Sequence, residues 1–212
     1  MRITALKQQI KNPDRVSVFV DAKYSFSLTL SQIISEKLKV GLELNDDLIS
    51  SLKSKSTDEK LRMKALNWTL LRPRSTRELQ DYLKRTTYQK SRPADTSEQT
   101  KLSVDDIVND FTTRGWVDDE VFARWWIERR SRADRSVSYI KSELMGKGVS
   151  REIIAEVLSS KDDSSALKEL VMKLKSKPKY ADRQKLMRYL VGKGFSYSSV
   201  TDALEAGDDN LD

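Results

Sequence analysis

The chain has 212 residues, of which 38% are hydrophobic and 33% charged, and this balance is typical of a folded protein rather than a disordered one. Cysteine and histidine are both absent, which excludes disulfides, thiol nucleophiles, Cys/His zinc sites and imidazole acid–base catalysis. The net charge of +7 favours nucleic acid, acidic protein surfaces or anionic lipid as partners, although many soluble proteins that bind none of these carry a similar excess.

The N-terminal residues lack a continuous apolar core, and no run of about 18 apolar residues occurs anywhere. We therefore expect neither a signal peptide nor a membrane span, and the lack of cysteine fits a location in the reducing cytoplasm. Only seven glycines and four prolines occur, which favours long helices with short connections.

An alternating pattern predicts a β-hairpin near the N-terminus. Residues 15–20 and 24–30 carry apolar or aromatic side chains at every second position, on either side of the turn Asp21-Ala22-Lys23. Residues 3–9 are a candidate edge strand. A sheet of only two or three strands is marginally stable on its own, so another element must cover the apolar face of the hairpin.

Two short helices are expected to provide that cover. The first begins at Ser31 and carries Ile34 and Leu38 four positions apart, and Gly41 ends it. Asn45 caps the second, which covers residues 46–52. Residues 1–55 are thus predicted to form a small ββαα unit.

Helical patterns continue from Ser56 to residue 115. Two segments have the form of a capping box, with serine at the N-cap and glutamate at N3: Ser56-Thr57-Asp58-Glu59 and Ser75-Thr76-Arg77-Glu78. Arg72-Pro73 separates the helices that they open. Residues 86–101 are polar and aperiodic and are interpreted as a flexible insertion, after which Ser103 is predicted to begin a third helix that ends at Gly115.

The next two segments follow the same plan of three helices. In residues 116–160 the predicted N-caps are Asp118 or Asp119, then Ser136, then Ser150. In residues 161–207 three apolar groups fall within 167–174, 186–190 and 200–204. The acidic residues 208–212 are expected to fray.

One phrase occurs twice, because residues 144–150 (Leu-Met-Gly-Lys-Gly-Val-Ser) are echoed by residues 190–196 (Leu-Val-Gly-Lys-Gly-Phe-Ser) at an offset of 46. A fixed internal period indicates stacked supersecondary units. The predicted fold is mainly α: three tandem three-helix repeats (56–115, 116–160 and 161–207) in an elongated array, preceded by the ββαα unit.

The sequence Gly146-Lys147-Gly148 resembles a phosphate-binding loop only superficially. A Walker A loop needs Gly-x-x-x-x-Gly-Lys-Ser/Thr between a strand and a helix, and here the glycines follow an amphipathic helix. A helix C-cap with glycine in the left-handed conformation is the better interpretation. The role of Lys147 and its repeat Lys193, as a contact to phosphate, carboxylate or water alone, stays open.

A dense basic run is the main candidate for binding, and it consists of Arg124, Arg129, Arg130, Arg132 and Arg135. A solvated helix face explains this run equally well. Trp125 lies at the edge of the apolar stripe beside these arginines, a setting found in interface hot spots and also in partly exposed packing. The acidic residues 118–120 suit a helix N-terminus. Since we see no catalytic pair, metal-ligand spacing or cofactor motif, we expect no enzyme, no metal and no cofactor.

The sequence resembles the RecX-type recombination regulators, the bacterial modulators of RecA, over residues 61–204. The resemblance is carried by residues 115–123 (Gly-Trp-Val-Asp-Asp-Glu-Val-Phe-Ala), by residues 143–149 (Glu-Leu-Met-Gly-Lys-Gly-Val) and by an Arg-x-Arg-Ser-x-x-Glu-Leu signature at residues 72–79. The N-terminal unit resembles an extension in longer members from Gram-positive bacteria.

This resemblance implies a cytoplasmic negative regulator of homologous recombination, DNA repair and the SOS response. Such a protein binds in the groove of the RecA–single-stranded DNA filament, inhibits ATP hydrolysis and strand exchange, and often binds single-stranded or double-stranded DNA itself. We expect a monomer. On motif position and exposure, the predicted partner or DNA contacts are Arg124, Trp125, Arg129, Arg130, Arg132, Lys147 and Lys193. Two alternatives stay open: a helical nucleic-acid-binding protein without a RecA partner, and a general protein-interaction scaffold.

Overall fold

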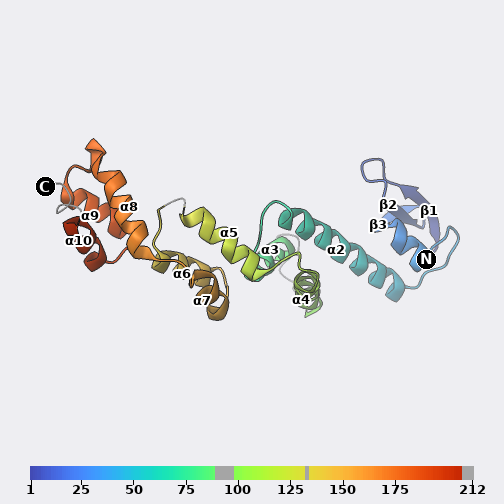
Figure 1. Ribbon diagram of the computed structural model, residues 1–212. Coiled ribbons are helices and arrows are strands. Elements are labelled where there is room, and N and C mark those ends of the chain that lie inside the picture. Colours follow the sequence, from blue (N-terminus) through green and yellow to red (C-terminus); the bar gives the residue numbers. More distant parts are fainter. Residues whose placement is uncertain (89–97, 132–133, 207–212) are drawn as a thin grey trace. The chain divides into compact units, whose positions relative to one another are not determined.

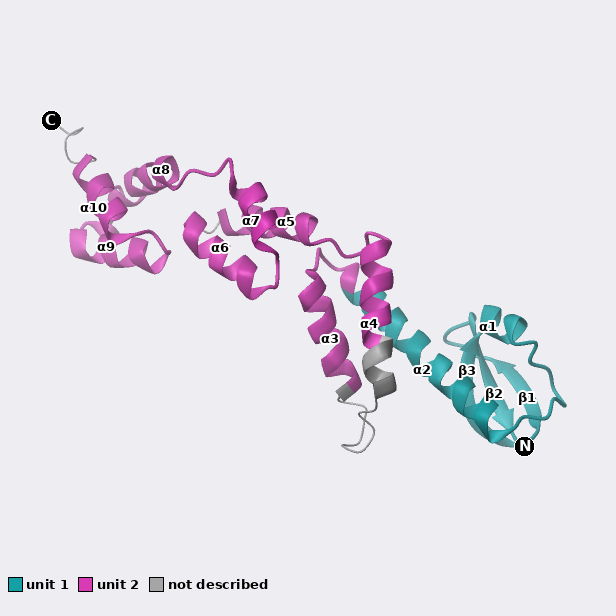
Figure 2. Ribbon diagram, turned by 90° about the horizontal axis from the view of Figure 1, so that it is seen from below, with its two compact units in different colours: residues 1–68 teal, residues 69–212 magenta. Residues whose placement is uncertain are grey.

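The structure, a computed structural model, describes residues 1–88, 98–131 and 134–206. It divides into two compact units, residues 1–68 and residues 69–212 (Figures 1 and 2). As predicted, the chain is mainly helical, with its strands confined in the described part to the N-terminal unit. Within these described ranges, none of the helices combines the length and the apolar character that a membrane span requires.

The first unit contains an antiparallel sheet of three strands, β1 (Ile3–Gln8), β2 (Arg15–Val20) and β3 (Lys23–Thr29), in the order β1-β2-β3. The predicted hairpin and its candidate edge strand are both confirmed. Asp21 and Ala22 have positive φ angles of 48° and 64°, and this pair of left-handed residues gives a turn whose twist matches the strands it joins.

The sheet buries its apolar side chains against the two helices that follow it, α1 (Leu30–Ser35) and α2 (Asp46–Thr69). Val18, Leu28 and Leu52 are fully buried in this cluster. Helix α1 begins at Leu30, one residue before the predicted start at Ser31, and ends at Ser35, short of the predicted end at Gly41. Thr29 is its cap, because Thr29 and Gln32 satisfy each other's backbone N–H groups in a capping box.

Helix α2 is one continuous helix of 24 residues, and the prediction of a new helix beginning at Ser56 is wrong. No glycine or proline interrupts the chain between Gly41 and Pro73. The Ser56 hydroxyl is buried and donates to the carbonyl oxygen of Ser27 at 2.6 Å, so it serves a long-range contact instead of a cap. The assignment of the C-terminal half of α2 to a first repeat beginning at residue 56 stays a prediction.

Replacing Ser56 with alanine is expected to lower the free energy of unfolding by about 1 kcal/mol. The loss stays moderate because the Ser27 carbonyl keeps a second donor, the Arg15 guanidinium, at 2.7 Å. Urea denaturation followed by circular dichroism measures the change, with Ser54→Ala as the control at an exposed position of the same helix. Equal effects of the two substitutions would contradict a structural role for the Ser56 hydroxyl.

The second unit begins with α3 (Thr76–Tyr88) and α4 (Glu98–Thr113). Ser75 caps α3 as predicted, since its hydroxyl accepts from the Glu78 N–H, but the Glu78 carboxylate binds Arg72 instead of completing the capping box. The prediction that Ser103 begins a helix is wrong: α4 starts five residues earlier, in a stretch free of glycine and proline. The predicted insertion at 86–101 therefore overlaps both helices, and its central part, residues 89–97, lies outside the described residues.

Three helices follow that we call the second repeat: α5 (Asp119–Ser131), α6 (Val137–Gly146) and α7 (Arg151–Leu158). Asp118 caps α5, which decides between the two predicted aspartates, and Ser136 and Ser150 cap α6 and α7 as predicted. The buried cluster of this repeat includes Phe122 and Leu144.

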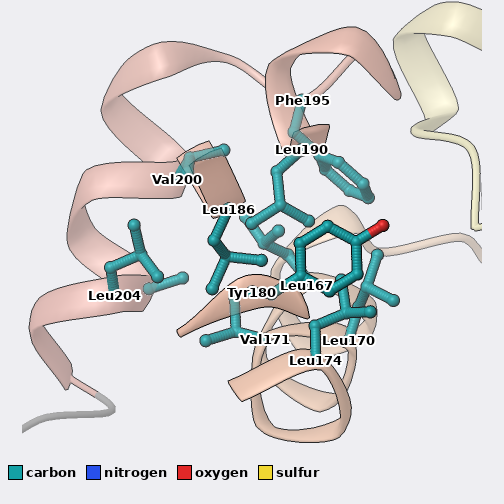
Figure 3. Packing of buried hydrophobic residues seen from close by; sticks show 11 residues of the cluster. Leu167, Leu170, Val171, Leu174, Tyr180, Leu186, Leu190, Phe195, Val200 and Leu204 are labelled. Atoms are coloured by element: carbon teal, nitrogen blue, oxygen red, sulfur yellow. The ribbon is translucent and has the colours of Figure 1, made fainter. Parts of the chain in front are cut away.

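The third repeat consists of α8 (Asp163–Lys175), the short 3-10 helix η1 (Pro178–Tyr180), α9 (Arg183–Gly192) and α10 (Tyr197–Ala206). Figure 3 shows its core, in which the predicted apolar groups of α8, α9 and α10 converge. Tyr180 of η1 joins this core although the sequence did not single it out. The predicted frayed tail, 208–212, lies outside the described residues.

Both Gly-Lys-Gly segments are helix C-caps, as predicted. In the first, the Val149 N–H reaches the Leu144 carbonyl and the Gly148 N–H reaches that of Met145, which is the Schellman pattern. The second repeats both bonds, from Phe195 to Leu190 and from Gly194 to Val191. Gly148 and Gly194 have φ angles of +81° and +98°, which only glycine adopts without strain.

Each cap also docks on the preceding helix group within this unit. The Ser75 hydroxyl donates to the Lys147 carbonyl at 2.8 Å, and the Ser136 hydroxyl donates to the Gly194 carbonyl at 2.7 Å. A carboxylate completes each junction: Asp119 accepts from the Thr76 N–H and Asp163 from the Val137 N–H. The duplicated phrase is thus a repeated docking joint between neighbouring helix groups.

Candidate functional site

The exposed face of α5 carries a stripe of three side chains spaced four positions apart, Val121, Trp125 and Arg129. Residues spaced by four lie on one side of a helix. Val121 is 55% exposed, Arg129 is exposed and Trp125 is half-buried. The buried residues of α5 include Phe122, on which the Trp125 ring packs, so the stripe lies at the border between the buried and the exposed side of the helix.

Two guanidinium groups lie against the Trp125 ring. The central carbon of Arg72 is 5.1 Å from the ring centre, and that of Arg129 is 5.8 Å away. The ring also packs on Phe122 and Trp126, at centroid distances of 6.0 and 5.9 Å. Cation–aromatic contacts of this kind place positive charge over the Trp125 ring and favour one orientation of it.

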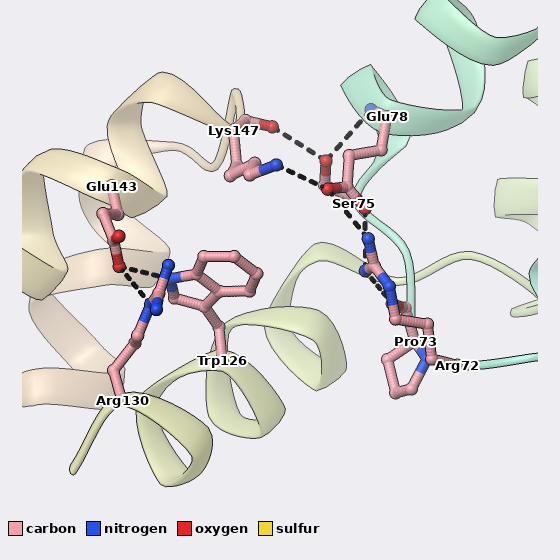
Figure 4. A network of polar contacts seen from close by, with 8 residues as sticks. All are labelled: Arg72, Pro73, Ser75, Glu78, Trp126, Arg130, Glu143 and Lys147. Atoms are coloured by element: carbon pink, nitrogen blue, oxygen red, sulfur yellow. Dashed lines mark hydrogen bonds and ion pairs between the residues drawn. The ribbon is translucent and has the colours of Figure 1, made fainter. Parts of the chain in front are cut away.

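Arg72 is itself fixed by a carboxylate. Its two terminal nitrogens donate to Glu78 at 2.9 and 3.2 Å, in the forked geometry that arginine forms with carboxylates. The Lys147 ammonium donates to the same carboxylate at 2.8 Å (Figure 4). Burial disfavours the charged form of Glu78, but the hydrogen bonds from Arg72 and Lys147 outweigh it and hold the pKa of Glu78 below its ordinary value.

A second carboxylate organises the other side of the same region. Glu143 accepts from the Trp126 indole N–H at 2.9 Å and from Arg130 at 2.6 Å. The Arg130 guanidinium lies 4.6 Å from the Trp126 ring centre, and the Lys147 ammonium lies 5.2 Å from it. Figure 4 shows Trp126 enclosed by Arg130, Glu143 and Lys147.

The structure therefore separates the predicted contact residues into groups. Arg130 and Lys147 are engaged in the internal ion pairs just described, while Trp125 and Arg129 form the exposed stripe. Arg124 is exposed and pairs with Glu120 one turn away, at 2.7 Å. Lys193 belongs to the third repeat, where its ammonium lies 5.1 Å from the Tyr189 ring centre. Arg132 lies outside the described residues.

Sequence reasoning missed two members of this surface, Val121 and Arg72. The sequence does contain a signal for Val121, because this apolar residue falls outside the predicted buried positions of its helix. Nothing in the sequence links Arg72 to Trp125, because the two residues are far apart along the chain and meet only through tertiary packing.

Comparisons with known proteins agree across most of the chain. Family models match at residues 1–45 (Regulatory protein RecX N-terminal domain), 118–158 (RecX, second three-helix domain) and 162–204 (RecX, third three-helix domain). Regulatory protein RecX from Bacillus licheniformis is 31% identical over 97% of this chain and 77% of its own length. The same protein from Listeria monocytogenes serotype 4a is 29% identical over 97% and 76%.

Two solved structures share the fold. A crystal structure of regulatory protein RecX has a TM-score of 0.67 at 23% identity, covering 95% of this chain and 98% of that one. A crystal structure of RecX from Lactobacillus salivarius has a TM-score of 0.54 at 21% identity, covering 71% and 96%. The chain therefore belongs to the RecX family, whose members are regulatory proteins rather than enzymes.

Proposed function

We propose that this protein is a negative regulator of homologous recombination and the SOS response that acts on RecA in the cytoplasm. It binds in the groove of the RecA–single-stranded DNA filament and inhibits ATP hydrolysis and strand exchange. The chain belongs to the RecX family, and the observation that carries the proposal is the exposed stripe on α5, where the Arg72 and Arg129 guanidinium groups lie against the Trp125 ring.

The chemistry of this stripe supports a protein partner. Tryptophan and arginine are the residues most enriched at interface hot spots, and an apolar neighbour such as Val121 adds area that loses water on binding. The ring is already fixed by its neighbours, so little side-chain freedom is lost when a partner covers it. We assign Arg124, whose charge is partly balanced by Glu120, to the rim of this surface, where charge mainly affects the association rate.

The test is RecA ATPase activity on single-stranded DNA with the protein titrated in. Wild-type protein is expected to inhibit at substoichiometric amounts. For the double variant Val121→Asp/Arg129→Glu, the protein concentration that gives half inhibition is expected to rise about tenfold or more. Both positions are exposed, so neither change disturbs the core. The control Val40→Asp/Arg151→Glu makes the same chemical changes at exposed positions elsewhere and should inhibit like wild type.

The other outcomes contradict the proposal in different ways. Inhibition that only reflects competition with RecA for bare DNA would support a nucleic-acid-binding protein without a RecA partner. No inhibition together with no DNA binding would support a general protein scaffold. Full inhibition by the Val121→Asp/Arg129→Glu variant would remove the α5 stripe as the contact surface.

A further inference from the structure

One short segment of the third repeat is strongly basic. Residues 172–193 contain eight lysines and arginines and a single acidic residue, Asp182. The resulting excess of seven equals the net charge of the whole chain, +7. The Asp182 carboxylate accepts from the backbone N–H groups of Gln184 and Lys185, so it serves as the cap of α9.

Tyrosines bring these charges onto one surface. The rings of Tyr180 in η1 and Tyr189 in α9 pack together with their centroids 4.9 Å apart. The Lys179 ammonium lies 5.5 Å from the Tyr180 ring centre, and the Lys193 ammonium lies 5.1 Å from that of Tyr189. Lys185, Tyr189 and Lys193 are spaced four apart along the chain, so they lie along one side of α9 and its C-cap.

Four cations of this surface are exposed and form no ion pair with any carboxylate that the structure describes. They are Lys177, Lys179, Lys185 and Arg188. In the part of the chain that the structure describes, no acidic side chain lies within 4.0 Å of any of their charged groups. These four residues, with Lys193 and the two tyrosines, are called the third-repeat basic surface below.

The composition of this surface favours a nucleic-acid phosphate backbone, rather than a protein, as its binding partner. Lysine is depleted at protein–protein interfaces, whereas it is a common contact to nucleic-acid phosphates. Tyr180 is 9% exposed and Tyr189 is half-buried against it, so these rings mainly support the lysines instead of offering an anchor to a partner. From Lys185 to Lys193 the helix rises about 12 Å, while a DNA strand places a phosphate about every 3.4 Å along a duplex, so several phosphates come within reach.

We propose that the third-repeat basic surface binds the phosphodiester backbone of DNA without reading its sequence, separately from the α5 stripe of the second repeat. The two surfaces differ in chemistry: arginine and tryptophan on α5, lysines over packed tyrosines on η1 and α9. The proposal deepens the function proposed above by assigning the nucleic-acid contact to the third repeat.

The experiment measures DNA binding by the full-length protein alone, by fluorescence anisotropy with a labelled single-stranded oligonucleotide and with its duplex. The variant carries Lys177→Gln, Lys179→Gln, Lys185→Gln and Arg188→Gln. Its affinity is expected to fall about tenfold or more at low salt, and the slope of log K against log salt to become shallower by about 3. A second variant keeps the charges by exchanging lysine and arginine at the same four positions and is expected to bind like wild type.

The matched control removes four exposed lysines from the first unit, with Lys11→Gln, Lys23→Gln, Lys39→Gln and Lys53→Gln. Wild-type-like binding by this control, with loss only in the third-repeat variant, supports the proposal, and a comparable loss on both DNA forms identifies the backbone as the ligand. An equal loss of DNA affinity in the third-repeat variant and in the first-unit control, or no loss in the third-repeat variant, would overturn the proposal. Because RecA is absent, failure here is distinct from failure of the RecA assay.

Discussion

Replacing Gly194 with alanine is expected to lower the free energy of unfolding by about 2–4 kcal/mol. At its φ of +98° an L-residue is strained, and the new Cβ would lie 2.6 Å from the Tyr139 Cβ and 2.7 Å from the Ser136 hydroxyl oxygen. The joint must therefore move, which breaks the hydrogen bonds from Ser136 to the Lys193 and Gly194 carbonyls. Gly148→Ala should act in the same way, because its Cβ would lie 2.6 Å from that of Arg77.

The chain supplies its own matched controls for these substitutions. Gly146 and Gly192, two residues earlier in each phrase, end helices α6 and α9, and a Cβ added at either position would meet no atom within 4 Å. Alanine there is expected to be neutral or to stabilise by about 0.5–1 kcal/mol. Thermal unfolding measures all four variants, with a change of about 2–4 °C in Tm for each kcal/mol. Similar Tm values for Gly194→Ala and Gly192→Ala would contradict the docking role of the joint.

The features that the sequence predicted well depend on local hydrogen bonding. Ser136 and Ser150 bond to N–H groups three residues ahead, and Gly148 takes a conformation set by its own lack of a side chain, so neighbouring residues suffice to identify them. Prediction failed where a residue serves a distant partner. Ser56 looks like a helix cap but bonds to the sheet, and Glu78 looks like half of a capping box but binds Arg72 and Lys147.

The same limit applies to the candidate site. The sequence identified Trp125 and Arg129 because both lie on one helix, close to an obvious basic run. Arg130 and Lys147 looked equivalent to Arg129 in sequence, and only the packed structure shows that Glu143 and Glu78 engage them. Basic residues can be counted from a sequence, whereas the carboxylates that neutralise them are found through tertiary contacts.

Glu78→Gln is expected to lower the free energy of unfolding by about 1–3 kcal/mol at neutral pH, because the change leaves Arg72 and Lys147 without their shared counter-charge. The side chains of Arg72 and Lys147 are 27% and 36% exposed, so water replaces part of the lost interaction, and the cost stays below that of a fully buried pair. Glu156→Gln, at an exposed position of α7, is the control and should change little.

The pH dependence distinguishes a lost ion pair from a general packing defect. The pKa of Glu78 is lower in the folded protein than its ordinary value, so its ionised form stabilises the fold at every pH above that ordinary value, about 4.3. That contribution disappears as the pH falls through the folded-state pKa, where wild-type Glu78 becomes as neutral as glutamine. The difference in free energy of unfolding between wild type and Glu78→Gln, measured by urea denaturation, should be full at pH 7 and shrink steadily below about pH 4. A difference that stays constant across this range would show that packing, and not charge, makes Glu78 important.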